Sequence, residues 1–171
     1  MTKLLSKKIQ ITILVAAAVV VAAGIVFALA VALQPVVPPG IKKQLSIAVL
    51  YPKDNTFAID HSSWKYDKSL GLLTYLVRDK DNNAKITVSE QSSPPQFSEV
   101  PGTLDALTSK LNTYADFDSI DGHAYLTHPK ELKGGQSALM NAKGTLMFAK
   151  PDKNLSDSDW HKFFNAIDIV R

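Results

Sequence analysis

The feature that most constrains this chain is an uncharged, apolar run over residues 9–33. Its only polar side chains are those of Gln10 and Thr12. An α-helix of this length reaches roughly 37 Å, which exceeds the hydrocarbon core of a bilayer at about 30 Å. The run is also longer than the apolar core of a secretory signal peptide, which has about 7–15 residues. We therefore predict an uncleaved transmembrane anchor helix at residues 9–33, held in the membrane lipid bilayer.

Charges and prolines beside this run predict how the rest of the chain is placed. Three lysines precede it: Lys3, Lys7 and Lys8. By the positive-inside rule, residues 1–8 are predicted to be a cytoplasmic basic tail, with the other end outside the bacterial cytoplasmic membrane. Residues 34–44 are rich in proline, which favours an extended connection, so we predict a stalk there. The extracytoplasmic domain is predicted to occupy residues 45–171.

Charge and cysteine content exclude several classes of function. The chain has 19 basic and 16 acidic residues, and three of the basic residues lie in the predicted tail. The predicted domain is therefore formally neutral, which argues against nucleic-acid binding, because counterion release needs a basic face. The chain has no cysteine, so disulfides, thiolate nucleophiles and zinc-thiolate sites are excluded.

Short apolar segments bounded by turn residues predict strands. The hairpin signal is clearest where D-K-D-N-N precedes Ile86 and Val88, which alternate with Thr87 and Ser89. Such alternation predicts a strand with one buried face. In all, we predict strands at residues 45–51, 56–60, 70–78, 86–89, 122–128, 136–141 and 145–149.

Two segments have helical periodicity. Residues 103–114 place Leu104, Leu107, Leu111 and Tyr114 three or four positions apart. The second helix begins at a capping pair, Ser156 and Asp159, with Leu155 and Trp160 at the spacing of a hydrophobic staple. One face of this helix is predicted to be core and carries Trp160, Phe163, Phe164 and Ile167. We therefore predict an α+β fold: a transmembrane helix, then an antiparallel sheet with both helices packed on one face.

Two acidic clusters and a pair of histidines are candidate metal sites. Residues 79–90, from Asp79 to Glu90, fit the spacing of an EF-hand calcium loop except that Ala84 replaces its glycine. The same residues suit a hairpin turn, which we favour, and calcium binding is the alternative. A second acidic cluster at residues 116–121 is interpreted as a solvated turn. His123 and His128 are five apart on a predicted strand, hence on opposite faces, so no metal site is predicted.

Catalytic motifs are missing from the sequence. No serine lies in a G-x-S-x-G context, and Gly134-Gly135 lacks the lysine and hydroxyl of a phosphate-binding loop. No sequence motif indicates a nucleophile, a base or an oxyanion donor. We therefore predict no catalytic residues, no cofactor and no enzymatic activity.

Five segments of the sequence are similar to segments found together in one group of proteins: residues 47–52, 56–63, 72–77, 86–97 and 144–149. In these segments the chain resembles an uncharacterised family of small, single-pass, extracytoplasmic proteins of reduced-genome bacteria. The resemblance covers about residues 45–170. Members often have a Leu-Pro-x-Gly-Tyr turn where this chain has Lys-Asp-Asn-Thr-Phe at residues 53–57. The resemblance implies a fold and a location, and it assigns no functional residues.

The predicted function is that of a membrane-tethered, non-enzymatic binding module. Its expected partner is a protein, peptide or glycan of the cell envelope. One alternative is a structural accessory subunit of a membrane complex, whose anchor packs through Ala18, Ala22 and Gly24. The other is an enzyme whose site is assembled from residues distant in the sequence.

Overall fold

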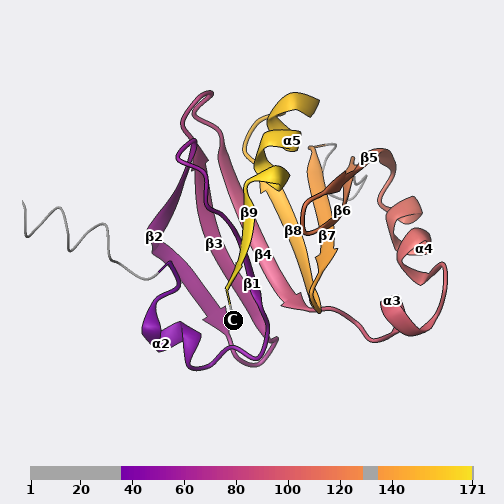
Figure 1. Ribbon diagram of the computed structural model, residues 1–171, viewed down its shortest axis with the longest axis horizontal. Helices are drawn as coiled ribbons and strands as arrows, with labels where there is room; N and C mark the ends of the chain where they lie inside the picture. The colour runs from indigo at the N-terminus through magenta and orange to yellow at the C-terminus, as the bar shows by residue number, and fades with distance from the viewer. Residues whose placement is uncertain (1–35, 129–134, 171) are drawn as a thin grey trace, which may run out of the picture. The chain divides into compact units, whose positions relative to one another are not determined.

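The computed structural model describes residues 36–128 and 135–170. Strands make up 47% of the fold and helices 19%, in two antiparallel sheets (Figure 1). The strands are β1 (Val49–Pro52), β2 (Phe57–Asp67), β3 (Leu72–Asp79), β4 (Lys85–Ser92), β5 (Thr113–Ser119), β6 (Gly122–Thr127), β7 (Ser137–Ala142), β8 (Thr145–Pro151) and β9 (Ile167–Val170). The helices are α2 (Pro39–Lys42), α3 (Gln96–Glu99), α4 (Thr103–Lys110) and α5 (Asp157–Asn165).

Seven strands form the large sheet, in the order β2-β3-β4-β8-β7-β6-β5. Both predicted hairpins are confirmed: β3 pairs with β4 and β7 with β8. The β7–β8 turn places Lys143 and Gly144 at φ values of 49° and 79°. Two successive left-handed residues are typical of the type I′ turn, whose twist matches that of the strands it joins.

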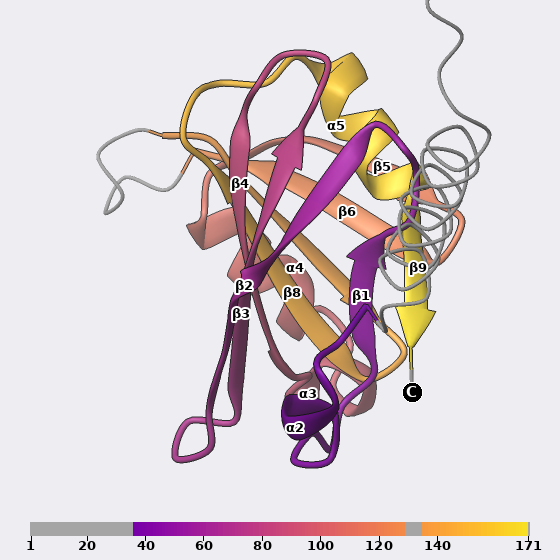
Figure 2. The same cartoon turned by 90° about the vertical axis from the view of Figure 1, so that its left-hand side faces the viewer.

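The second sheet is a two-stranded ribbon that pairs β1 with β9, which we call the β1–β9 ribbon. Figures 1 and 2 show the two strands side by side along one face of the large sheet, next to α5. The hydroxyl of Thr145 in β8 donates to the carbonyl of Ala48, at 2.7 Å. The ribbon therefore forms a second layer over the centre of the sheet.

The core lies between the large sheet and this second layer. Alternate residues of the central strands face it and are fully buried, among them Leu73, Tyr75, Val77, Ile86, Val88, Met140, Met147 and Ala149. From α5, Trp160, Phe163 and Phe164 are at most 1% exposed. The predicted aromatic stripe is thus confirmed as core for these three residues. Ile167 is also buried, but it belongs to β9 because the helix ends at Asn165.

The predicted fold class is wrong. The domain is mostly β and has two sheets instead of one. Tyr125 alternates along β6 with the buried Ala124 and Leu126, so it faces away from the core. Burial raises the pKa of Tyr125, and the nearby charge of Asp105 in α4 raises it further. Helix α4 therefore lies on the opposite side of the sheet from α5.

The helix predicted at residues 103–114 is too long. Helix α4 ends at Lys110, and Asn112 adopts a left-handed φ of 53° before β5 begins. Thr108 is its only buried residue, so the leucine stripe is not a core face. By contrast, the strand predicted at residues 56–60 is too short, because β2 extends to Asp67. In the predicted stalk, residues 39–42 form α2 and are not extended.

The single-pass membrane anchor is not supported by the fold. Within residues 36–128 and 135–170, no helix has the length and apolar character needed to cross a bilayer. The predicted transmembrane segment, residues 9–33, lies outside the described residues. For the described residues, the mostly β, two-sheet fold replaces the predicted α+β fold.

The start of α5 confirms the predicted capping box. The backbone N–H of Asp159 donates to the Ser156 hydroxyl at 3.2 Å, and the Ser156 N–H donates to the Asp159 carboxylate at 3.2 Å. Leu155 before the cap and Trp160 after it are both buried, as the staple spacing predicts. This cap fixes where the helix begins, and with it the position of every side chain on its exposed face.

Replacing Ser156 with alanine is expected to lower the free energy of unfolding by about 1 kcal/mol. The substitution removes the acceptor for the Asp159 N–H and leaves that donor to water. Urea denaturation measures the change. Ser158→Ala is the matched control, because Ser158 lies within the same first turn and has no capping bond. Equal losses in the two variants would contradict the assigned role of the cap.

Candidate ligand groove beside helix α5

An open groove of about 470 Å³ lies between α5, the β1–β2 turn and the β3–β4 turn. We call it the α5 groove. Its lining residues are Asp54, Thr56, Phe57, Asp81, Ser158, His161, Lys162, Asn165 and Ala166. Most of these side chains are polar, and Phe57 and Ala166 supply apolar surface. The volume falls in the range of about 300–1,000 Å³ that is usual for small-molecule sites.

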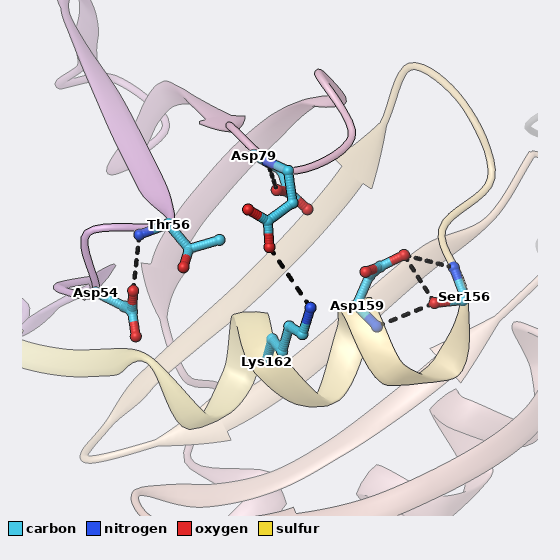
Figure 3. A network of polar contacts seen from close by, with 7 residues as sticks. Asp54, Thr56, Asp79, Ser156, Asp159 and Lys162 are labelled. Carbon is cyan, nitrogen blue, oxygen red and sulfur yellow. Dashed lines mark hydrogen bonds and ion pairs between the residues drawn. The ribbon is translucent and has the colours of Figure 1, made fainter.

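The β1–β2 turn holds Asp54 at one wall of the groove. One carboxylate oxygen of Asp54 accepts the backbone N–H of Thr56 at 2.7 Å (Figure 3). Hydrogen bonds from the backbone and then the side chain of Thr56 lower the pKa of Asp54, so it is ionised at neutral pH. The Asp54 carboxylate also lines the groove. This turn is joined to the end of α5 because Lys53 N–H donates to the Ala166 carbonyl at 2.9 Å.

The β3–β4 turn forms the opposite wall. The carboxylate of Asp79 accepts the Asp81 N–H at 2.9 Å, which closes the turn. The Asp81 carboxylate lies 3.5 Å from the ammonium group of Lys162 in α5. Figure 3 shows Lys162 extending from the helix toward this turn, beside the capping pair of α5. Both turns are therefore attached to the helix, one at each end of the groove.

Helix α5 provides the third wall, and the apolar floor comes from Phe57 of β2 and from Ala166, which follows α5. The ring of Phe57 packs edge-on against Phe163, with centroids 5.4 Å apart. The ring of His161 packs over Phe117 of β5, with centroids 3.9 Å apart. These contacts hold the floor and the imidazole in place. The exposed side chains of Ser158 and Asn165 add a hydroxyl and an amide along the same helix face.

The residues considered for calcium do not surround a common point. Asp79 ends β3, whereas Glu90 lies well along β4 and pairs with Leu73. The ladder closes at Arg78 and Lys85, so Glu90 lies about 17 Å from the turn at about 3.4 Å per residue. Asp79 and Asp81 form the hairpin turn described above. Among the described residues, no group of three or more His, Asp or Glu side chains is arranged to hold a metal ion.

Glu90 belongs to a second polar cluster, which is fully buried. Its carboxyl group is 0% exposed, and both oxygens lie 3.2 Å from the backbone nitrogen of Leu50 in β1. The Tyr75 hydroxyl lies 3.1 Å from one of these oxygens and also donates to the Leu50 carbonyl. The indole of Trp64 stacks on the Tyr75 ring at 4.2 Å. Glu90 was not predicted from the sequence to have this role. Its spacing from Ile86 and Val88 could have shown that it faces the core.

The third polar cluster lies on the β5–β6 hairpin. The two ring nitrogens of His123 lie 2.7 Å from Asp118 and 2.9 Å from Asp116. Burial lowers the pKa of His123, but its bonds to the two carboxylates outweigh this effect and raise the pKa above its usual value. His128 stacks on Tyr114 instead, with centroids 4.5 Å apart. Two residues of the acidic cluster that was predicted to be a solvated turn, Asp116 and Asp118, thus bind the imidazole of His123.

We expect the imidazole of His123 to titrate above pH 6.5 in the intact protein. Replacing both Asp116 and Asp118 with asparagine should lower the pKa of His123, because the imidazolium then loses its two charged acceptors. A ¹H–¹³C NMR titration of the ring measures both values. Asp121→Asn is the control, since Asp121 lies in the same hairpin and forms no ion pair with His123 within the described residues. An unchanged pKa in the double variant would refute the ion pairs.

The α5 groove combines residues 54–57, 81 and 158–166, which no local sequence pattern connects. The groove was therefore not predicted from the sequence. The resemblance to extracytoplasmic proteins concerns strand and turn segments and stays a prediction. Comparisons with protein-family models, curated proteins and solved structures give no match.

Proposed function

We propose that this protein is a non-enzymatic binding module and that the α5 groove holds its ligand. The observation that carries the proposal is the ionised carboxylate of Asp54, which is fixed by the turn and lines the groove. It stands at the wall of an open groove whose floor is aromatic. Fixed polar groups above an apolar floor are the usual composition of a binding site.

Binding is favoured over catalysis by how the polar groups are arranged. A nucleophilic site needs a hydroxyl within hydrogen-bonding reach of a base, and a third group to orient that base. Ser158 and His161 both line the groove, but no hydrogen bond among the described residues joins their side chains. The imidazole packs on Phe117 rather than on a carboxylate. The groove thus offers recognition groups without a proton-transfer pair.

The charges of the groove favour a cationic ligand. Asp54 and Asp81 bring two carboxylates, and Lys162 brings one ammonium group. The ammonium group is already placed against Asp81, so no cation among the groove residues is paired with Asp54, and the charge that acts on Asp54 from outside the groove is that of Lys80. A guanidinium group binds a carboxylate through paired hydrogen bonds. We therefore propose a peptide segment with an arginine side chain as the ligand, its backbone lying along Ser158 and Asn165.

A titration of the ¹⁵N-labelled full chain with the blocked peptide acetyl-Gly-Arg-Gly-amide tests this proposal. Amide shifts should change in α5 and in the turn at residues 54–57. Acetyl-Gly-Gln-Gly-amide, without the charge, should bind at least about tenfold more weakly, since a charge-assisted hydrogen bond contributes about 1.5–3 kcal/mol. Chitobiose is added in a separate titration to represent a glycan ligand.

Asp54→Asn is the decisive variant, because an asparagine oxygen can still accept the Thr56 N–H while the charge is lost. It should weaken binding of the arginine peptide by about tenfold. The matched control is Asp67→Asn, because Asp67 accepts the Ser69 N–H at 2.9 Å in an equivalent turn outside the groove. Equal affinity of Asp54→Asn and the wild type would overturn the proposal. Shifts caused only by chitobiose would replace the peptide with a glycan.

A further inference from the structure

The edge of β1 that faces the large sheet is completed by side chains instead of a strand. On its other edge β1 pairs with β9. At Leu50 the backbone N–H lies 3.2 Å from both oxygens of Glu90, and the carbonyl accepts the Tyr75 hydroxyl. These two side chains, from β4 and β3, occupy the positions that a neighbouring strand would otherwise fill. They are therefore the polar link between the β1–β9 ribbon and the sheet at this residue.

The number of hydrogens in this cluster indicates that Glu90 is protonated. A tyrosine hydroxyl has one hydrogen, and that of Tyr75 is donated to the Leu50 carbonyl. The contact of 3.1 Å between the Tyr75 and Glu90 oxygens then needs a hydrogen from Glu90. A neutral carboxyl group closes the ring: Leu50 N–H to Glu90, Glu90 O–H to Tyr75, and Tyr75 O–H to Leu50. With a carboxylate at Glu90, the single Tyr75 hydrogen could serve only one of its two acceptors, the Leu50 carbonyl or Glu90.

The surroundings of Glu90 also favour the neutral form. Burial raises its pKa to about 8, although the Leu50 N–H and the Tyr75 hydroxyl act in the opposite direction. Among the described groups that face it, β3 brings only the phenol of Tyr75, and β8 brings Met147. In the ribbon, Asp168 of β9 binds Lys53 at 2.8 Å and Tyr51 at 3.4 Å. No described cation therefore compensates a charge on Glu90.

We propose that Glu90 is a pH-sensitive latch: its protonated carboxyl group holds the β1–β9 ribbon on the sheet, and loss of the proton releases the ribbon. Release lets water reach the carboxylate, which burial would otherwise leave without a compensating charge. The ribbon also carries two walls of the α5 groove. Residues 54–57 follow β1, and α5 precedes β9, with Lys53 and Ala166 hydrogen-bonded between them. Release is therefore expected to loosen the groove, a consequence that rests on the proposed function.

Hydrogen exchange of the full chain, followed by NMR from about pH 5.5 to 8.5, tests the latch without any ligand. The reporter is the Leu50 amide, which is bonded directly to Glu90. After correction for intrinsic exchange, its protection should fall about tenfold per pH unit up to about pH 8, because opening the ribbon releases one proton. The opening that exposes the amides of β7 to exchange should have a higher free energy than the opening that exposes the Leu50 amide. The Lys53 and Ala166 amides report the groove separately.

Glu90→Gln is the matched variant, because an uncharged amide can donate to Tyr75 and accept from Leu50. Its Leu50 protection should not depend on pH. The latch is overturned if the wild type shows no pH dependence at Leu50, if the variant keeps the same slope, or if Leu50 and β7 open at one common free energy. If only the Lys53 and Ala166 amides fail to respond, the latch stands and its link to the groove is refuted.

A measurement on the wild type alone covers the case in which the variant does not fold. A protonated carboxylic acid has an infrared carbonyl band that is distinct from that of a carboxylate. At about pH 6.5, ordinary aspartates and glutamates are ionised, so one such band should remain and should disappear by about pH 9.5. If no carboxylic-acid band is present at about pH 6.5, the proposal is refuted.

Discussion

Replacing Phe163 with alanine is expected to lower the free energy of unfolding by about 3–5 kcal/mol. Domains of this size have a total stability of only about 5–15 kcal/mol, so the variant should be close to unfolding. The ring is 0% exposed and contacts three aromatic residues: it packs edge-on against Phe57 of β2 and lies against Trp160 and Phe164 of its own helix. Its loss removes apolar contacts and leaves a cavity that these neighbours cannot fill.

Urea denaturation followed by tryptophan fluorescence measures this effect. Phe163→Leu should lose less stability than Phe163→Ala, because leucine fills most of the space. Asn165→Ala serves as the surface control in the same helix, and it should change stability by no more than about 0.5 kcal/mol. Similar values for Phe163→Ala and Asn165→Ala would show that the helix does not pack on the sheet as described.

The second large effect is a pH dependence of stability that comes from Glu90. In the folded chain its pKa is about 8, and in the unfolded chain it returns to about 4.5. Between these values the folded state keeps a proton that the unfolded state releases. The contribution of Glu90 is therefore complete below about pH 4.5 and decreases by about 1.4 kcal/mol per pH unit as the pH rises to about 8.

Urea denaturation at about pH 5.5, 6.5 and 7.5 measures this slope. In Glu90→Gln the slope should disappear, apart from what other groups contribute, because the amide does not titrate. A third variant, Glu90→Ala, should be less stable than Glu90→Gln at every pH, since it leaves the buried Leu50 N–H without an acceptor. Parallel stability curves for the wild type and Glu90→Gln would contradict a neutral, buried carboxyl group.

Local patterns predicted much of the strand content. The two hairpins and the capped helix were found because each depends on residues close in sequence: turn residues, alternation, and the pair Ser156 and Asp159. Strand β5 was missed because a leucine spacing of three and four was extended to Tyr114. The alternation that begins at Thr113 places Ala115 and Phe117 on the side opposite Asp116 and Asp118. Since α4 buries only Thr108, its leucine spacing did not reflect packing.

The remaining features depend on contacts between distant segments. Strand β9 has four residues, too few for a periodic signal, and it is a strand because β1 pairs with it. The α5 groove likewise exists only where two turns meet a helix. The burial of Glu90 is the exception, because its spacing from Ile86 and Val88 already places all three on one face. A polar residue at a core position of an alternating strand was the signal that could have led to this cluster.

The pairing of β1 with β9 also determines when folding can be completed during synthesis. Val49 pairs with Val170, so the first strand must wait until about 120 further residues have left the ribosome. Closing so long a loop is slow, because its entropy is lost before the new contacts form. The hairpins of the large sheet need no such delay. We expect nascent chains that stop before residue 167 to contain the sheet with its central face still open, a form on which chaperones act.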